Sequence, residues 1–558
     1  MANPSTFSVL NRAKQLETLQ STTYDLAIIG GGITGAGIAL DAASRGMTVC
    51  LVEKHDFASG TSNKSTKLIH GGLRYLKQFE IGLVHESGTE RAIVHKLAPH
   101  LVVPEKMLLP LIKGGTYGKL LTSIGLKIYD YLADVSKSDK RVMLDKTETL
   151  KKEPLLDDSK VLGGGLYAEY RTDDARLTIE ILKTAASFGA NLINYCDVQS
   201  FNYNQNHKIK SLNCIDHNTE NTLVIKAKHF ISATGPWVDT LRNKDHSLTQ
   251  KHLHITKGVH IVFPWEKLPI KQSVYFDVPD GRMVFAIPRG RITYVGTTDT
   301  NYSGNLNRVV ATKQDVEYLI NAVNNTFNQL NLTLSDVESS WAGLRPLIHE
   351  DGKAPSELSR KDELFISESG LISIAGGKLT GYRKMAQRAI KAVLKQMDDE
   401  EKSNLKKSKT TQIPLVNPSF KDENEVSQFQ NQLKEELKAM GVTDAYYAPY
   451  LCATYGKMAD SIILKSASFE NTDSLTRLIR AELWYSIHHE MVNSLSDFFV
   501  RRTGRLFFDI ASVKTYSELI LKDMAEYLGW DSSRISTEKN NLNILILDAT
   551  TFYDSEFM

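Results

Sequence analysis

A short apolar segment followed at once by a glycine-rich turn lies near the start of the chain, and it constrains the fold more than any other feature. Residues 26–29 are apolar, and residues 30–35 carry three glycines in the spacing G-x-G-x-x-G. Residues 37–44 then have helical spacing, and residues 47–52 have the composition of a second buried strand. A strand, a glycine turn, a helix and a strand in this order are typical of a Rossmann-like dinucleotide-binding unit in an α/β fold.

The glycines of this turn and one acidic residue each have a physical role in such a unit. Gly30 permits the tight turn, Gly32 lets a pyrophosphate approach the backbone, and Gly35 lets the helix pack closely on the strand. The N-terminus of the helix offers N–H groups to the phosphates. Glu53 follows the second strand and would accept hydrogen bonds from a ribose hydroxyl. NAD and FAD both fit this pattern; NADP fits it least, because it prefers an arginine near that position.

Length, charge and cysteine content exclude several classes of protein. At 558 residues the chain suggests about three or four domains. Its formal net charge of +2 gives no general attraction to nucleic acid. The four cysteines form no C-x-x-C pair, which argues against a zinc site and against a disulfide framework. His488 and His489 would point in different directions on a helix, so we expect no metal site there either.

Two observations concern membranes. The N-terminal residues lack the apolar core of a secretory signal, and no stretch of about 18 apolar residues exists to span a bilayer. We therefore expect a cytoplasmic protein. Residues 112–133 mix leucine, isoleucine and lysine, which fits two alternatives: a helix on the inner face of the cell membrane, or an ordinary amphipathic helix on a core.

Two later segments repeat the pattern of a strand that runs into a turn of small residues. Residues 229–239 read HFISATGPWVD, and residues 371–394 run from a strand through Gly376 and Gly377 into a helix. Small residues let the backbone crowd a ligand, and the helix N-terminus favours an anionic group. Three such segments fit FAD better than a nicotinamide cofactor, because FAD is extended and must be held at both the adenosine and the isoalloxazine ends.

Pattern changes along the chain give a provisional domain organisation. Residues 173–189 have the pattern of a capped helix, residues 255–300 are rich in strands, and helical patterns dominate after the charged residues 398–409. We interpret residues 146–156 as a charged connector. The predicted units are a discontinuous FAD-binding domain (20–80, 151–245 and 341–397), a substrate-binding domain (81–150 and 246–340), a linker (398–412) and an all-helical C-terminal domain (413–545).

Eight motifs in order resemble one family, the FAD-dependent glycerol-3-phosphate dehydrogenases of the respiratory, quinone-linked type. They are TSNKSTKLIHGGLRYL, EYRTDDARL, ATGPWV, GTTDT, GLRPL, SRKDE, AGGKLTGYRKMA and DFFVRRTGRLFFD. The resemblance covers residues 23–395 and continues at 497–509. It implies a D-amino-acid-oxidase-like fold, in which an antiparallel-sheet substrate domain joins the Rossmann-like domain. It also implies oxidation of sn-glycerol 3-phosphate to dihydroxyacetone phosphate by hydride transfer to flavin, with electrons passed to a membrane quinone.

The resemblance leaves alternatives open. Asn63 stands where the family pattern TSSxSSK has a second serine, which should affect local hydrogen bonding more than chemistry. The related oxygen-using glycerol-3-phosphate oxidases carry an extra insertion for which we see no room before Arg345. The oxidase remains an alternative, as do a flavoenzyme of the same fold that acts on an amino acid and a flavin-binding protein without catalytic activity. The C-terminal helices could mediate a homodimer.

The resemblance and the motifs together name the candidate site residues. We expect FAD to contact Gly30, Gly31, Gly32, Thr34, Gly35, Glu53, Lys54, Thr61, Ser62, Gly235, Gly376, Gly377, Lys378, Leu379 and Thr380. We expect the substrate to contact Arg74, Tyr75, Arg345, Arg360, Lys378 and Thr380. Arginine suits a phosphate dianion because its planar guanidinium donates two parallel hydrogen bonds.

The oxidation also needs an acceptor for the hydroxyl proton. His70 is the first choice for this base, and His260 is the second. Alternatively, the positive charge of Arg345 could lower the pKa of the hydroxyl and let water take the proton. His70 and Arg345 are therefore the predicted catalytic residues.

Overall fold

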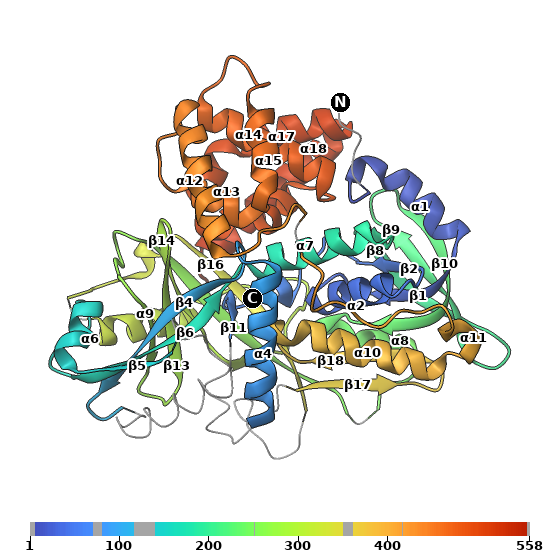
Figure 1. Ribbon diagram of the computed structural model, residues 1–558, viewed down its shortest axis with the longest axis horizontal. Coiled ribbons are helices and arrows are strands. Elements are labelled where there is room, and N and C mark those ends of the chain that lie inside the picture. Colours follow the sequence, from blue (N-terminus) through green and yellow to red (C-terminus); the bar gives the residue numbers. More distant parts are fainter. Residues whose placement is uncertain are drawn as a thin grey trace.

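The described part of the chain forms two sheets and a bundle of helices (Figure 1). The structure, a computed structural model, describes residues 6–70, 81–115, 140–249, 251–327, 329–349, 361–415 and 417–554. In Figure 1 the sheets lie side by side, and the C-terminal helices lie above them.

The first sheet has eight strands and a parallel centre. Strand β1 lies between β10 and β2, and both neighbours run parallel to it. Buried aliphatic residues fill these strands, as expected where helices cover both faces of a sheet. The order is β17 (Asp362–Ile366), β18 (Leu371–Gly376), β10 (Asn221–Ser232), β1 (Thr23–Ile29), β2 (Val49–Val52) and β7 (Asn191–Ile193), with β9 (Ile209–Asp216) and β8 (Cys196–Tyr203) extending from β10. Both strands predicted around the glycine turn are confirmed.

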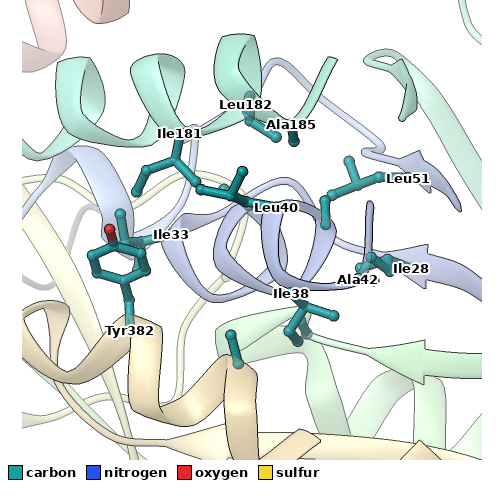
Figure 2. Packing of buried hydrophobic residues seen from close by; sticks show 14 of the residues in the cluster. Ile28, Ile33, Ile38, Leu40, Ala42, Leu51, Ile181, Leu182, Ala185 and Tyr382 are labelled. Carbon is teal, nitrogen blue, oxygen red and sulfur yellow. The ribbon is translucent and has the colours of Figure 1, made fainter. Parts of the chain in front are cut away.

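Helix α2 (Ile33–Ser44) is packed between the first sheet and two other helices, α7 (Asp174–Ser187) and α10 (Tyr382–Gln396). Figure 2 shows Ile28 and Leu51 of the sheet and Ile181 of α7 pointing toward it. On the α10 side, a Cβ atom at Gly37 would lie 2.8 Å from the ring of Tyr382, so only glycine permits this contact. Tight packing on all sides fixes the position of the helix N-terminus, where the glycine turn ends.

The second sheet has ten strands, most of them antiparallel. Its order is β15 (Thr300–Asn301), β11 (Leu253–Pro264), β14 (Ile292–Gly296), β13 (Met283–Arg289), β12 (Ser273–Asp277), β4 (Val103–Ile112), β6 (Val161–Arg171) and β3 (Leu68–Ile69), with β16 (Ser339–Ile348) on β11 and β5 (Val142–Leu144) on β6. The strands predicted within 255–300 are confirmed. The fold class, a Rossmann-like sheet joined to a largely antiparallel sheet, is as the sequence predicted.

Three strands of the second sheet lie outside the substrate-binding domain predicted from the sequence, among them the short β3, which falls within residues 20–80. We had placed residues 151–245 and 341–397 in the FAD-binding domain, but β6 and nearly all of β16 fall within those ranges. β6 pairs with β4 along most of its length, and β16 pairs with β11 over ten residues. These long pairings hold both segments in the second sheet. The pairings show which sheet each strand joins, and the domain boundaries stay a prediction.

The other helices complete the architecture. Around the sheets lie α1 (Arg12–Ser21), α4 (Ile81–Leu97), α6 (Lys146–Lys152), α8 (Val238–Lys244) and α9 (Lys313–Thr326), and the predicted linker contains the short α11 (Asp399–Lys402). The C-terminal part contains α12 (Glu423–Ala439), α13 (Tyr447–Tyr455), α14 (Ala459–Ser466), α15 (Ser474–His489), the π-helical turn η8 (Asp497–Arg502), α16 (Arg505–Phe508), α17 (Ile510–Leu528) and α18 (Ser532–Thr550). The connector predicted at 146–156 is wrong in part, because α6 begins there with a capping box between Asp145 and Glu148.

Buried ion pairs join the C-terminal helices to the first sheet. Arg502 Nη1 lies 2.8 Å from Asp56 Oδ2, just beyond β2, and Arg176 Nη1 of α7 lies 2.7 Å from Glu490 Oε2. All four side chains are at most 4% exposed.

The membrane prediction is tested only in part. Within the described ranges, no helix combines the length and apolarity needed to cross a membrane. Most of the segment 112–133, where we considered an interfacial helix, lies outside the described residues.

Candidate cofactor and active site

A cavity opens at the carboxyl ends of the parallel strands β1, β2, β10 and β18, where ligands bind in open α/β sheets. Most of the residues predicted to contact FAD line it: Gly30, Gly32, Thr34, Glu53, Lys54, Thr61, Ser62, Gly235, Gly376, Gly377, Lys378 and Leu379. The three segments selected from the sequence therefore meet at one place, although they are separated by some 200 and 340 residues along the chain.

The glycine turn leaves no room for side chains. Gly30 has a φ of +109°, and a Cβ atom there would lie 2.6 Å from the carbonyl oxygen of Ala233. A Cβ atom at Gly35 would lie 1.9 Å from the carbonyl oxygen of Gly30. Gly32 precedes α2 without a capping side chain, and Ser62 Oγ accepts a hydrogen bond from Ile33 N at 2.9 Å. This cradle of backbone at a helix N-terminus fits a pyrophosphate.

Glu53 is held rigidly at the end of β2. Its two carboxylate oxygens accept hydrogen bonds from Gly31 N at 2.7 Å and from His55 N at 2.9 Å. Burial raises the pKa of Glu53, and these two N–H donors partly offset that effect. Each oxygen keeps a second lone pair, so the carboxylate can also accept from a ribose hydroxyl.

The opposite end of the cavity contains the second glycine turn. Gly376 and Gly377 have φ values of +74° and +81°. A Cβ atom at Gly377 would lie 2.5 Å from the sulfur of Met385, so the turn is as crowded as the first one. The 3₁₀ turn η6 (Leu379–Gly381) leads directly into α10, whose N-terminus adds positive potential there.

Lys54 and Trp237 form one wall of the cavity. The ammonium group of Lys54 lies 4.0 Å from the centre of the Trp237 ring and donates to Asn307 Oδ1 at 2.9 Å. Burial lowers the pKa of Lys54. Trp237 is packed against Gly60, where a Cβ atom would lie 3.1 Å from the ring.

His70 is oriented by a buried carboxylate. Its Nδ1 lies 2.8 Å from Glu169 Oε1, and the Glu169 side chain is fully buried. Arg91 donates to the backbone carbonyl of Ala168 at 2.9 Å and reaches Glu169 Oε2 at 3.5 Å. Thr380 donates to the backbone carbonyl of His70 at 3.3 Å, which joins the predicted base to the second glycine turn. A ring N–H that donates to a buried carboxylate is the arrangement that supports a general base.

Arg345 lies on β16, next to Pro346, which lines the cofactor cavity. Its Nη1 donates to Asp299 Oδ1 at 3.0 Å and to the carbonyl of Thr298 at 3.1 Å, and its Nη2 donates to Thr297 Oγ1 at 2.9 Å. Asp299 therefore neutralises part of its charge and fixes its orientation.

His260, the second candidate base, is a packed residue of β11. Its ring stacks on Trp341 at 4.8 Å, and its Nε2 lies 3.0 Å from Thr66 Oγ1. Burial, followed by the positive charges of Arg345 and Lys67, lowers its pKa well below the usual value. The neutral imidazole is enclosed in the sheet.

The structure describes only some of the remaining residues predicted to bind the substrate. Lys378 lines the cofactor cavity and lies 3.5 Å from Ser87 Oγ of α4. Arg74, Tyr75 and Arg360 lie outside the described residues. The structure thus joins His70 to Thr380, two residues after Lys378 of the cavity lining, although neither His70 nor Thr380 lines the cavity itself. Arg345 lies on β16 of the second sheet.

Known proteins share this sequence almost from end to end. Residues 25–383 match the family described as FAD dependent oxidoreductase, and residues 408–535 match the C-terminal domain of alpha-glycerophosphate oxidase. The chain is 50% identical over 546 residues to an aerobic glycerol-3-phosphate dehydrogenase of Bacillus subtilis (strain 168), covering 97% of this chain and 98% of that protein. The chain belongs to the FAD-dependent aerobic glycerol-3-phosphate dehydrogenases. The prediction of FAD as cofactor and the family resemblance are thereby confirmed.

Solved structures agree with the family assignment. A glycerol-3-phosphate dehydrogenase from Bacillus halodurans complexed with FAD is 42% identical, with a TM-score of 0.82 and 98% of each chain covered. An L-alpha-glycerophosphate oxidase from Mycoplasma pneumoniae with FAD bound is 19% identical, with a TM-score of 0.54 over 70% of this chain and 97% of that chain. The second likeness shows a shared fold alone.

Sequence reasoning missed several residues of the site. Glu169 lies within EYRTDDARL, one of the motifs that carry the resemblance, but it received no role. Trp237 lies within the predicted strand and turn of residues 229–239, so its position in the wall was within reach of the sequence. Residues 196–198 together with Thr240, Leu241 and Lys244 also contribute to the cavity, and no motif marks them.

Proposed function

We propose that this dehydrogenase oxidises sn-glycerol 3-phosphate to dihydroxyacetone phosphate and passes the electrons to a quinone. The name and the 50% identity of the Bacillus subtilis relative support the substrate. The observation that carries the chemistry is the hydrogen bond of 2.8 Å between His70 and the buried Glu169. His70 is joined through its carbonyl to Thr380, next to Leu379 of the cavity lining.

The glycine turns and Glu53 would hold FAD in the cavity. Gly30, Gly32 and the N-terminus of α2 would bind the pyrophosphate, and Glu53 would bind the adenosine ribose. Gly376 and Gly377 would let the other end of the cofactor approach the backbone before α10. When bound, FAD supplies the hydride acceptor of the reaction.

Protein side chains would bind the substrate and move its proton. His70 would take the hydroxyl proton at Nε2, while Glu169 accepts from Nδ1 and stabilises the imidazolium that forms. Arg345 and Lys378, together with Arg74, Tyr75 and Arg360, would surround the phosphate, and Thr380 would position the substrate beside His70. Asp299 would keep the Arg345 guanidinium in one orientation for a bidentate contact.

The proposal extends to the location and the oligomeric state of the enzyme. We also propose that the protein is cytoplasmic and works on the inner face of the membrane, where it would meet a quinone acceptor. A homodimer through the C-terminal helices remains part of the proposal.

Anaerobic stopped-flow reduction tests the proposed function. Glycerol 3-phosphate should bleach the flavin absorbance of the holoenzyme, and D-amino acids should not. Reoxidation by a quinone, faster than by oxygen, would support the acceptor; the reverse order would favour an oxidase instead. Bleaching by D-amino acids alone would overturn the proposed substrate.

A further inference from the structure

A second cavity lies where the two sheets meet the C-terminal helices, and we call it the junction cavity. The loop after β2 supplies Asn63 and Lys64, β16 supplies Trp341 and Leu344, and the C-terminal part supplies Phe507 and Leu545. About half of the side chains that line it are apolar or aromatic, and the others are polar or charged. Such a composition, with polar groups among apolar walls, is typical of a site for a small organic molecule.

Only a thin wall separates the junction cavity from the cofactor cavity. Ser59, Gly60, Thr61, Pro236 and Trp237 line both cavities. Within the loop after β2, Ser62 and Ser65 line the cofactor cavity, whereas the residues between them, Asn63 and Lys64, line the junction cavity.

Two polar side chains of the junction cavity, Asn63 and Lys64, have no side-chain partner among the described residues. Asn63 is 1% exposed, and neither Oδ1 nor Nδ2 of its side chain is hydrogen-bonded. Lys64 is half-buried, and among the described residues no hydrogen bond or ion pair holds its ammonium group. Burial, followed by the nearby charge of Arg501, lowers the pKa of Lys64 to about 8. A buried polar group without a partner is costly, so the Asn63 amide indicates that a ligand completes its hydrogen bonds, and the ammonium group of the adjacent Lys64 adds a second donor.

The other charged groups of the cavity are already paired. Arg501 forms ion pairs with Asp56 and Asp497, and Arg308 forms one with Asp548. Lys64 is therefore the one lining cation of the described residues that lacks an ion-pair partner. A phosphate dianion would need more uncompensated cations than this, whereas a carbonyl oxygen needs only a donor.

We propose that the junction cavity binds the ring of the quinone acceptor, with Lys64 and Asn63 donating hydrogen bonds to its carbonyl oxygens and the apolar walls packing on its faces. This inference rests on the proposed function. Oxidation of a secondary alcohol to a ketone releases two electrons and two protons, and a quinone takes up two of each in becoming a quinol. Lys64 would give one proton to a carbonyl oxygen and recover it from solvent, and water would give the second proton to the other carbonyl oxygen.

Binding of 2-methyl-1,4-naphthoquinone to the oxidised holoenzyme without substrate tests the site. Quenching of tryptophan fluorescence reports occupancy, because Trp237 and Trp341 line the cavity. Lys64→Met should weaken binding about tenfold, the loss expected for one charge-assisted hydrogen bond. Lys64→Arg, which keeps a positively charged donor, should recover part of the lost affinity for the quinone. Lys226→Met, which removes an exposed lysine of β10, serves as the matched control and should bind like the wild type.

The outcomes separate this inference from the proposed function. Equal quinone binding in Lys64→Met and wild type would overturn the junction cavity as the acceptor site. Inorganic phosphate that displaces the quinone, and whose own binding Lys64→Met abolishes, would overturn it in favour of an anion site. Failure of glycerol 3-phosphate to reduce the flavin would instead overturn the proposed function, and the binding measurement would still decide the cavity because it contains no substrate.

Discussion

The guanidinium group of Arg345 occupies the space that a Cβ atom on Gly258 would fill. Such an atom would lie 2.3 Å from Nη2 and 2.6 Å from Cζ of Arg345. Gly258 lies on β11 and Arg345 on β16, which pair in the second sheet. The missing side chain on one strand therefore determines where the charged group of the other strand lies, together with the ion pair of 3.0 Å to Asp299.

Gly258→Ala should move the guanidinium of Arg345 and weaken substrate binding. We expect the KM for glycerol 3-phosphate to rise about tenfold, compared with about 100-fold for Arg345→Ala, the range for one or two charged hydrogen bonds. The melting temperature should change little, because the displaced atoms are the mobile end of a long side chain. Steady-state kinetics measure the KM, thermal unfolding measures the melting temperature, and FAD content shows that the cofactor is still bound. An unchanged KM in Arg345→Ala with FAD still bound would show that Arg345 does not contact the phosphate.

Loss of the proposed base should slow the reduction of the flavin by substrate. His70→Asn should lower the rate in anaerobic stopped flow about 100-fold or more, the usual contribution of a general base. Glu169→Gln should lower it about 10- to 100-fold, because an amide orients the imidazole less well and does not stabilise its charged form.

The control for His70→Asn is His207→Asn, at an exposed turn residue with a φ of +57° that asparagine tolerates. It should leave the rate unchanged. A normal rate in His70→Asn would exclude His70 as the base. A normal rate in Glu169→Gln alone would mean that Glu169 only packs against the ring.

The sequence could predict the cofactor side of the site better than the catalytic side. The glycine turn at residues 30–35 follows from local spacing, and it predicted the strands and helix that surround it. Glu169 meets His70 only because β3 and β6 pair in antiparallel register, with Ile69 opposite Tyr170. A contact between residues 99 positions apart leaves no periodic signal. The junction cavity is harder still to predict, because three distant parts of the chain form it.

Two further features of the sequence indicate secondary structure that the predicted domain organisation does not contain. Asp145 and Glu148 have the spacing of a capping box, which marks the start of α6 inside the supposed connector. The apolar residues within 161–171 are compatible with a strand, but they do not predict which of the two sheets this strand joins. That choice depends on long-range pairing with β4.

Acid should weaken the contact between the C-terminal helices and the first sheet. Burial alone would raise the pKa of Asp56, but the charges of Arg502 and Arg501 lower it to about 2. Glu490 behaves alike: the charges of Arg176 and Lys183 outweigh burial and lower its pKa to about 2. In an unfolded chain these groups titrate near pH 4. Their stabilising effect is therefore complete above about pH 4 and is lost as the pH falls through about 2.

Asp56→Asn tests this dependence. At pH 7 it leaves Arg501 and Arg502 without their buried carboxylate, a change that typically costs about 3–5 kcal/mol, so the melting temperature should fall clearly. The difference from wild type should shrink as the pH is lowered from 4 to 2, because the wild-type carboxylate becomes protonated. The exposed Asp158→Asn should show no such difference at any pH. A gap between Asp56→Asn and wild type that stays constant down to pH 2 would contradict the assigned ion pairs.

Gly35→Ala should abolish FAD binding while Gly82→Ala retains it. Both glycines lie in helices, but a Cβ atom at Gly35 would lie 1.9 Å from the carbonyl oxygen of Gly30, whereas one at Gly82 would meet nothing within 4 Å. The turn must then shift away from the position that seats the pyrophosphate, since backbone atoms cannot yield as a side chain does. The purified Gly35→Ala protein should lack flavin absorbance, and added FAD should not raise its melting temperature as it does for an apoprotein that binds it. A yellow Gly35→Ala protein with wild-type FAD content would show that the cofactor does not depend on this turn.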